Sequence, residues 1–274
     1  MRKLLGTLIV GALLGGVLAA GPARAAHEVT VYGLTTQNRL LTFASGTPDD
    51  ILRNKKVSGL ASGESLVGID VRPATGALYG VGKTSSGAGK VYTLDARSGA
   101  ASFVASISVM LQGGEFGVDF NPVVDRIRVV SDADQSLAVN PDTGAAAVNG
   151  NLNYPSSTQN PFVTGAAYTN NVGGATSTVL YDIDAGSDDL VTQNTSTGAL
   201  TKVADLGTST EPFVGWDIRT SGGADVAYAS FTTLASNGKY DARLLRINLS
   251  DGSVVTDWGR IGGPRFVRDI AVGS

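Results

Sequence analysis

The sequence repeats itself with a period of about fifty residues, and this repeat restricts the fold more than any other feature. Five similar apolar segments recur along the chain, with anchor residues at Gly68, Gly117, Gly165, Gly215 and Val267. Consecutive anchors are separated by 49, 48, 50 and 52 residues. A regular period of this length is typical of solenoids and propellers, in which each repeat is one structural unit.

Each unit continues with three further apolar runs separated by turns. The second run carries a Tyr in segments 78–81 and 180–183, and the third run precedes a Gly-bearing turn such as 141–144. Gly supplies the positive φ that tight turns need, and Asp, Ser and Thr brace such turns with side-chain hydrogen bonds. Short runs rich in Val, Leu, Ile and Tyr between turns predict strands, so each unit predicts a four-stranded antiparallel sheet.

The two ends of the chain complement each other. The last unit stops after its first predicted strand, 266–272, whereas segment 29–34 matches the Tyr-bearing second strand. Pairing these ends in one sheet closes a ring and removes the unpaired edges of an open array. The sequence therefore predicts an all-β fold, a five-bladed β-propeller of four-stranded antiparallel blades in one domain over 26–274. An open β-solenoid and a two-sheet sandwich are the alternatives.

The N-terminal segment has the pattern of a secretory signal peptide. Arg2 and Lys3 precede an apolar run over 4–20, and Ala-Arg-Ala follows at 23–25. We expect cleavage after Ala25, giving an exported bacterial protein of the periplasm or the extracellular space with no membrane span after cleavage. An uncleaved membrane anchor is the alternative, although the run is short for a bilayer span.

Composition excludes several kinds of chemistry. The chain has no Cys and a single His, His27, so Cys-based zinc sites, Cys nucleophiles and disulfide scaffolds are ruled out. A net charge of −3 argues against a nucleic-acid partner, because no excess of basic residues is available to neutralise phosphates. Carboxylates remain as the main source of site chemistry.

Two sets of carboxylates fall at corresponding places in the repeat. The first set aligns within the first strand of four units, and the second set lies in the loop just before that strand. The first-strand set is Asp70, Asp119, Asp217 and Asp269, and the loop set is Glu64, Glu115 and Glu211. Because first strands line the channel of a propeller, we predict a ligand-binding ring of carboxylates at the channel mouth. Such a ring suits a hard cation such as Ca²⁺ or acid and base work on a sugar.

The same aspartates have a purely structural interpretation. Their carboxylates would accept hydrogen bonds from backbone N–H groups between blades. Alternatively, they would pair with Arg72 and Arg219, which lie two residues after Asp70 and Asp217 on the same side of the strand.

Two other segments are candidates for recognition. The interval 149–161 departs from the repeat and is rich in Asn, so Asn151, Asn153 and Tyr154 are candidate ligand-binding residues for a sugar. A crossover of extra length is the alternative. Segment 181–189 contains four Asp, which we interpret as a solvated hairpin turn, with a Ca²⁺ site as the alternative.

The chain resembles a known family over most of its length. Segment 117–131, Gly-Val-Asp-Phe-Asn-Pro-Val-Val-Asp-Arg-Ile-Arg-Val-Val-Ser, continued by Asn-Pro-Asp-Thr-Gly at 140–144, is similar to a bacterial secreted family known as domain of unknown function 4394. The likeness runs from about Val31 to Val272. The resemblance implies a propeller-like exported protein with no established activity, and it supplies no catalytic residues.

These observations favour an exported, non-enzymatic propeller of uncharacterised role. We expect it to be a monomer that binds a small molecule, a glycan or an envelope protein at the channel mouth. We predict no cofactor and keep Ca²⁺ as the alternative. A carboxylate-dependent glycoside hydrolase is the competing function, with its catalytic residues unknown.

Overall fold

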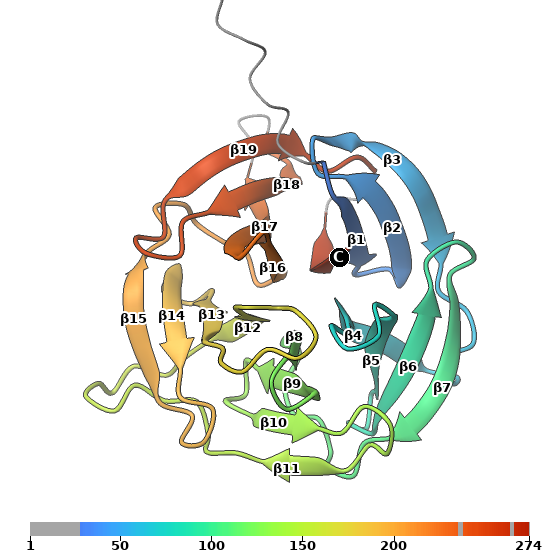
Figure 1. The fold of residues 1–274 in the computed structure, drawn as a ribbon, viewed down its shortest axis with the longest axis horizontal. Helices are drawn as coiled ribbons and strands as arrows, with labels where there is room; N and C mark the ends of the chain where they lie inside the picture. The colour runs from blue at the N-terminus through green and yellow to red at the C-terminus, as the bar shows by residue number, and fades with distance from the viewer. Residues whose placement is uncertain (1–27, 235–237, 264–265, 274) are drawn as a thin grey trace, which may run out of the picture.

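The computed structural model describes residues 28–234, 238–263 and 266–273, so the expected signal peptide at 1–25 lies outside the described residues. The described residues form twenty strands in five four-stranded antiparallel sheets, arranged as blades around a central axis (Figure 1). None of the described residues belongs to a helix with the length and hydropathy of a membrane span. The predicted five-bladed propeller is confirmed.

The blades follow one another along the chain, with the innermost strand first. Blade 1 consists of β4 (Glu64–Val71), β5 (Leu78–Thr84), β6 (Gly89–Asp95) and β7 (Ala100–Ser106). Blade 2 consists of β8 (Phe116–Asn121), β9 (Arg126–Ser131), β10 (Ser136–Val139) and β11 (Ala146–Val148). Blade 3 consists of β12 (Val163–Tyr168), β13 (Leu180–Asp184), β14 (Asp189–Gln193) and β15 (Leu200–Asp205). Blade 4 consists of β16 (Val214–Ser221), β17 (Ala224–Leu234), β18 (Tyr240–Ile247) and β19 (Val254–Arg260).

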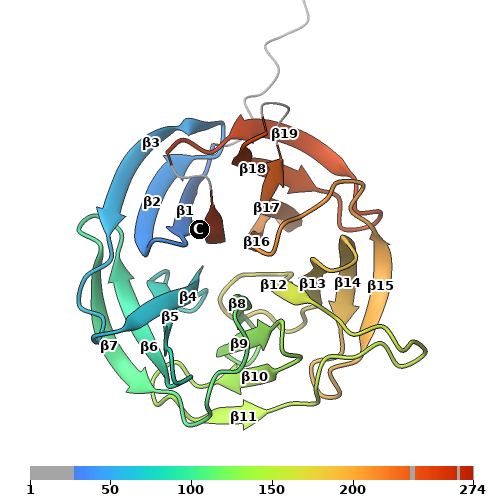
Figure 2. The ribbon, with the colours of Figure 1, turned by 180° about the vertical axis from the view of Figure 1, so that it is seen from behind.

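Blade 5 joins the two ends of the chain, as the sequence predicts. Its innermost strand is β20 (Val267–Val272), and its outer strands are β1 (Thr30–Thr35), β2 (Arg39–Ala44) and β3 (Thr47–Lys56). Strands β20 and β1 pair antiparallel, with Tyr32 opposite Ala271. Because the first and last strands share one sheet, the ring is closed, which is seen from both sides in Figures 1 and 2.

The turn between the third and fourth strands has the same construction in successive blades. In blade 2, the Oδ1 of Asn140 accepts hydrogen bonds from the backbone N–H groups of Asp142 and Thr143. Gly144 closes the turn with φ of 72°, and a Cβ there would lie 2.0 Å from the carbonyl oxygen of Ser106 in blade 1. Glycine is therefore required at this turn both by its φ and by the neighbouring blade.

The hydrophobic core lies between adjacent blades. One cluster, for example, joins Val81 and Val91 of blade 1 to Phe116 and Val129 of blade 2. Comparable clusters lie between the other adjacent pairs of blades. Burial of both faces of each sheet against its neighbours holds the ring together and brings the five innermost strands around the axis.

Candidate functional site

The four predicted aspartates all lie on innermost strands, but one is displaced along the axis. We call Asp70, Asp119, Asp217 and Asp269 the axial aspartates. The pairing between the first and second strands shows which residues of the five blades are equivalent. Residues at the same level of a blade lie opposite equivalent residues of its second strand. These facing pairs are Asp70 with Tyr79, Asp119 with Arg128, Ala167 with Tyr181, Asp217 with Tyr228, and Ala271 with Tyr32. The equivalent of the aspartate in blade 5 is therefore Ala271.

Asp269 thus lies two residues before the predicted position, and the expected alignment is corrected. Asp269 occupies the place held in the other four blades by Gly68, Gly117, Gly165 and Gly215. A Cβ on Gly68 would lie 2.9 Å from the Oδ2 of Asp269. The side chain of Asp269 therefore fills space that the neighbouring glycine leaves open.

Backbone hydrogen bonds from neighbouring blades hold the axial aspartates. The Oδ2 of Asp70 accepts from the N–H of Phe120 at 2.7 Å, and the Oδ1 of Asp119 accepts from the N–H of Tyr168 at 3.2 Å. Asp217 and Asp269 similarly accept from the backbone N–H groups of Val272 and Ile69. Each bond crosses from one blade to the next, so these residues link the blades in the manner of the structural interpretation.

Electrostatics make this cluster unusual. Each axial aspartate is at most 2% exposed. Burial raises the pKa of Asp70, Asp119 and Asp269 well above the usual value, and the neighbouring carboxylates raise it further. Burial also raises the pKa of Asp217 to about 6. One oxygen each from Asp70, Asp119 and Asp217 lie within 4.8 Å of one another, so three carboxylates from three blades meet near the axis.

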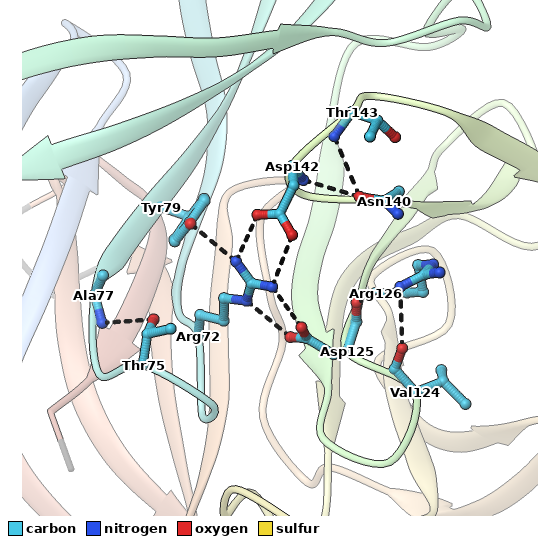
Figure 3. Close-up of polar contacts among 10 residues, drawn as sticks. All are labelled: Arg72, Thr75, Ala77, Tyr79, Val124, Asp125, Arg126, Asn140, Asp142 and Thr143. Atoms are coloured by element: carbon cyan, nitrogen blue, oxygen red, sulfur yellow. Dashed lines mark hydrogen bonds and ion pairs between the residues drawn. The ribbon is translucent and has the colours of Figure 1, made fainter.

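The predicted ion pair between Asp70 and Arg72 is not formed. Arg72 instead donates to Asp125 and Asp142 of blade 2, with its Nη1 2.8 Å from Asp142 Oδ1, and to the hydroxyl of Tyr79 (Figure 3). These two carboxylates hold the pKa of Arg72 above its usual value. Arg72 therefore clamps blade 1 to blade 2 and leaves Asp70 without a basic partner.

The three predicted loop glutamates do not converge. Glu64 is buried within blade 1, where it binds Lys90 at 3.0 Å and the hydroxyl of Tyr92 at 2.8 Å. Glu115 instead pairs with Arg268 of β20 at 3.0 Å. Among the described residues, one group of three or more potential metal ligands comes together, and it consists of Asp70, Asp119 and Asp217 without any of these glutamates. Glu211 contacts β17 through its backbone N–H, which donates to the carbonyl of Thr232.

A set of cavities lies at the opposite mouth of the channel from Glu64, where the innermost strands end. A cavity of about 410 Å³ lies there between Tyr32, Val71, Arg219 and Gly273. Arg219 also borders two further cavities, of about 190 Å³ and about 420 Å³. Its Nε donates to the carbonyl oxygen of Gly273 at 2.9 Å, which fixes the side chain across the mouth. Sequence reasoning considered Arg219 as a partner of Asp217 and missed its place at this mouth.

The irregular interval before blade 3 is fastened to that blade. It runs along the rim between β11 and β12 (Figure 1). The backbone of Asn153 pairs with Ala199, and its Nδ2 donates to the carbonyl of Asn151 at 2.7 Å. The hydroxyl of Tyr154 donates to Asp184 at 2.7 Å. These contacts match the crossover interpretation, and a ligand-binding role of Asn151, Asn153 and Tyr154 stays a prediction.

The acidic hairpin of blade 3 is largely buried, which corrects its interpretation as a solvated turn. Asp182 and Asp184 are 0% exposed, and Asp189 is 5% exposed. Neither side-chain oxygen of Asp182 has a hydrogen-bond partner among the described residues. Nearby, Arg128 donates to Ser136 and Asn149. Asp182 belongs to a strand that packs against blade 2, and this burial could not be read from the local run of acidic residues.

Replacing Asp182 with Asn is expected to stabilise the protein at pH 8 by about 1–3 kcal/mol, because a buried charge without partners is removed. Burial raises the pKa of Asp182 well above its usual value, although Arg128 opposes the shift. The folded state therefore binds this proton more tightly than the unfolded state, and the parent loses stability as pH rises. Urea unfolding of both proteins between pH 4 and 8 measures the difference, which should vanish toward pH 4. A less stable variant at pH 8 would contradict this account.

Comparisons with known proteins give one family match over most of the chain and structural matches of low sequence identity. No curated protein gives a significant sequence match. A crystal structure of a nidogen/laminin complex is similar with 9% identity and a TM-score of 0.45, over 90% of this chain and 99% of that chain. A Bacteroides thetaiotaomicron protein of unknown function has 13% identity and a TM-score of 0.48, over 91% of this chain and 65% of that chain. A computationally designed protein has 10% identity and a TM-score of 0.38, over 92% of this chain and 66% of that chain. This chain thus spans slightly less than two thirds of the length of the Bacteroides protein and of the designed protein.

A family model described as "Domain of unknown function (DUF4394)" matches residues 39–271.

Proposed function

This chain belongs to the family described as "Domain of unknown function (DUF4394)", and we propose from its geometry that it is an exported, non-enzymatic propeller that binds a small anionic ligand, such as an acidic sugar. The binding site is the channel mouth at the ends of the innermost strands. The observation that carries the proposal is the position of Arg219, which borders three adjoining cavities there.

A second arginine supports an anionic ligand. Arg246 and Arg219 line the same cavity of about 420 Å³, and neither forms an ion pair with any described carboxylate. Glu28 lines this cavity too, without pairing with either arginine. Two guanidinium groups that form no ion pair with a described carboxylate present donors in the geometry that carboxylates and phosphates accept.

Aromatic side chains on the same cavity suit a sugar ring. Tyr228 and Trp258 both line it, and their rings stack with centroids 5.4 Å apart and an interplanar angle of 8°. Tyr228 is only 5% exposed and one of its faces is covered by Trp258, so it is the half-buried Trp258 that offers apolar surface beside the charged donors to a ligand with a carbon ring. By contrast, the axial aspartates are at most 2% exposed, so a sugar ring cannot reach them and they lend no support to a glycoside hydrolase.

Binding to an array of neutral and acidic mono- and oligosaccharides tests the site. We expect acidic members to bind and Arg219→Gln and Arg246→Gln each to weaken that binding about tenfold or more, since a charge-assisted hydrogen bond contributes about 1.5–3 kcal/mol. Arg243→Gln is the matched control, because Arg243 pairs with Asp257 on the surface of the same blade. Undiminished binding by both arginine variants, or binding of neutral sugars alone, would overturn the proposal.

The export part of the proposal is tested separately. It is supported by Arg2, Lys3 and the apolar run over 4–20. Expression of the full chain in a bacterium should give a periplasmic or secreted protein whose first residue is Ala26. Recovery of the intact chain with its first residues in the cytoplasmic fraction would contradict export.

A further inference from the structure

The axial cluster is independent of the mouth site, and its geometry points to a second ligand of a different kind. Asp70, Asp119 and Asp217 come from β4, β8 and β16, so three separate blades each supply one carboxylate. The blades are held in place by their own packing against neighbours. The three oxygens are therefore brought together by ring closure, without any local loop that would gather them.

One of these carboxylates has a buried oxygen that makes no hydrogen bond of ordinary geometry within the described chain. The Oδ2 of Asp217 accepts the backbone N–H of Val272, and its Oδ1 is the oxygen without such a bond, although the backbone N–H of Ile218 lies near enough to lower the pKa of this carboxyl. Asp217 is 1% exposed. A buried charged acceptor without a partner is rare in a native protein and calls for a bound water or an ion.

No basic side chain forms an ion pair with this cluster, although the charge of Arg219 lowers the pKa of Asp217 from a distance. Ion pairs among the described residues involve Arg72, Lys90, Lys202, Arg243, Arg260 and Arg268, and none of them reaches an axial aspartate. Asp269 adds a fourth buried carboxylate, which lies on β20 two residues before the position equivalent to the other three aspartates. Several carboxylates in one dry space repel one another unless protons or a cation compensate them.

We propose that Asp70, Asp119 and Asp217 bind one Ca²⁺ ion on the propeller axis, where it ties blades 1, 2 and 4 together. Burial favours Ca²⁺ over Mg²⁺. The three carboxylates are at most 2% exposed, and Mg²⁺ dehydrates reluctantly and usually keeps several waters, whereas Ca²⁺ accepts protein oxygens in flexible geometry. The three oxygens lie within 4.8 Å of one another, which allows all of them to reach one Ca²⁺ ion. The hydrogen bonds from Phe120, Tyr168 and Val272 orient the carboxylates and leave further lone pairs for the ion.

The test uses the purified protein after removal of metal with a chelator. Adding Ca²⁺ at millimolar concentration should raise the melting temperature by about 5 °C or more, because the ion binds only the folded state. Isothermal titration calorimetry should give one ion per chain, with Mg²⁺ at least tenfold weaker.

Asp217→Asn is the decisive variant, because its amide oxygen can still accept the N–H of Val272 while the charge is lost. We expect this variant to fold and to lose the Ca²⁺-dependent rise in melting temperature. Asp182→Asn is the matched control, since Asp182 is equally buried but lies outside the group of three. Its response to Ca²⁺ should equal that of the parent.

Three results would overturn the inference. They are a parent protein with neither calorimetric binding nor a thermal shift, an Asp217→Asn variant that binds Ca²⁺ as tightly as the parent, and a preference for Mg²⁺. The first result would mean that protons alone compensate the cluster. Binding of Ca²⁺ by the Arg219→Gln variant separates this site from the mouth site, so either proposal can fail without the other.

Discussion

Replacement of Gly117 by alanine is expected to destabilise the protein by about 3 kcal/mol or more, which corresponds to about 6–12 °C in melting temperature for a chain of this size. Gly117 lies on β8, the innermost strand of blade 2, which contacts β12, the innermost strand of blade 3. A Cβ at Gly117 would lie 2.5 Å from the backbone nitrogen of Ala166 and 2.7 Å from the carbonyl carbon of Gly165. Both atoms belong to the backbone of β12, so relief requires the two innermost strands to separate.

Gly33→Ala is the matched control for this prediction. Gly33 also lies within a strand, but the nearest atoms to a Cβ there are side-chain atoms at 3.5–3.6 Å, which is ordinary van der Waals contact. We expect the control to change stability by less than about 1 kcal/mol. Thermal and urea unfolding of the two variants side by side measure the difference. Equal stability of the two would show that the blades can adjust at the axis, contrary to a ring fixed by close backbone contact.

Replacement of Arg72 by methionine is expected to cost about 2 kcal/mol of stability, about 4–8 °C in melting temperature. Methionine keeps an unbranched apolar side chain at this position but removes the hydrogen bonds to Asp125, to Asp142 and to the hydroxyl of Tyr79. The side chain of Arg72 is 10% exposed, whereas those of Asp125 and Asp142 are 37% and 61% exposed. Water can therefore solvate the abandoned carboxylates in part, which keeps the loss below that of a fully buried pair.

Arg243→Met separates this clamp from ordinary surface pairs. Arg243 and Asp257 form a 2.7 Å ion pair, but their side chains are 39% and 41% exposed. Surface pairs of this kind contribute about 0–1 kcal/mol, so the variant should be nearly as stable as the parent. Chemical unfolding at low salt and at 0.5 M salt compares the two losses. If Arg72→Met were as mild as Arg243→Met, the clamp between blades 1 and 2 would have no special role in holding the ring.

The repeat made the architecture predictable because its strands and turns are specified by residues close together in the sequence. Gly144 illustrates this: its turn needs a positive φ, and that need appears in the sequence as Pro-Asp-Thr-Gly before the structure is known. Strand order follows from short connections, and ring closure follows from the matching incomplete units at the two ends. Tyr32 on β1 was enough to place the N-terminal strand as the second strand of the last blade.

The candidate site was predictable only in part. The placement of the axial aspartates on innermost strands is what the repeat implies. The predicted alignment of Asp269 with the other aspartates was wrong by two residues. The apolar residues around Asp269 fit either of two alignments with the repeat, and only the pairing of β20 with β1 selects one. Glu64 was placed at a mouth, yet its partners Lys90 and Tyr92 draw it into its own blade.

The sequence by itself determined the number of blades, their strand order and the closure of the ring, because turns and alternating strands depend on residues close together in the chain. The tertiary structure decided which groups meet. Arg72 reaches carboxylates 53 and 70 residues away, and Asp70 accepts an N–H that lies 50 residues further on. Such contacts depend on how one blade packs against the next, and this packing cannot be predicted from the sequence of a single repeat. For the same reason the mouth beside Arg219 and the burial of Asp182 became visible only in the folded ring.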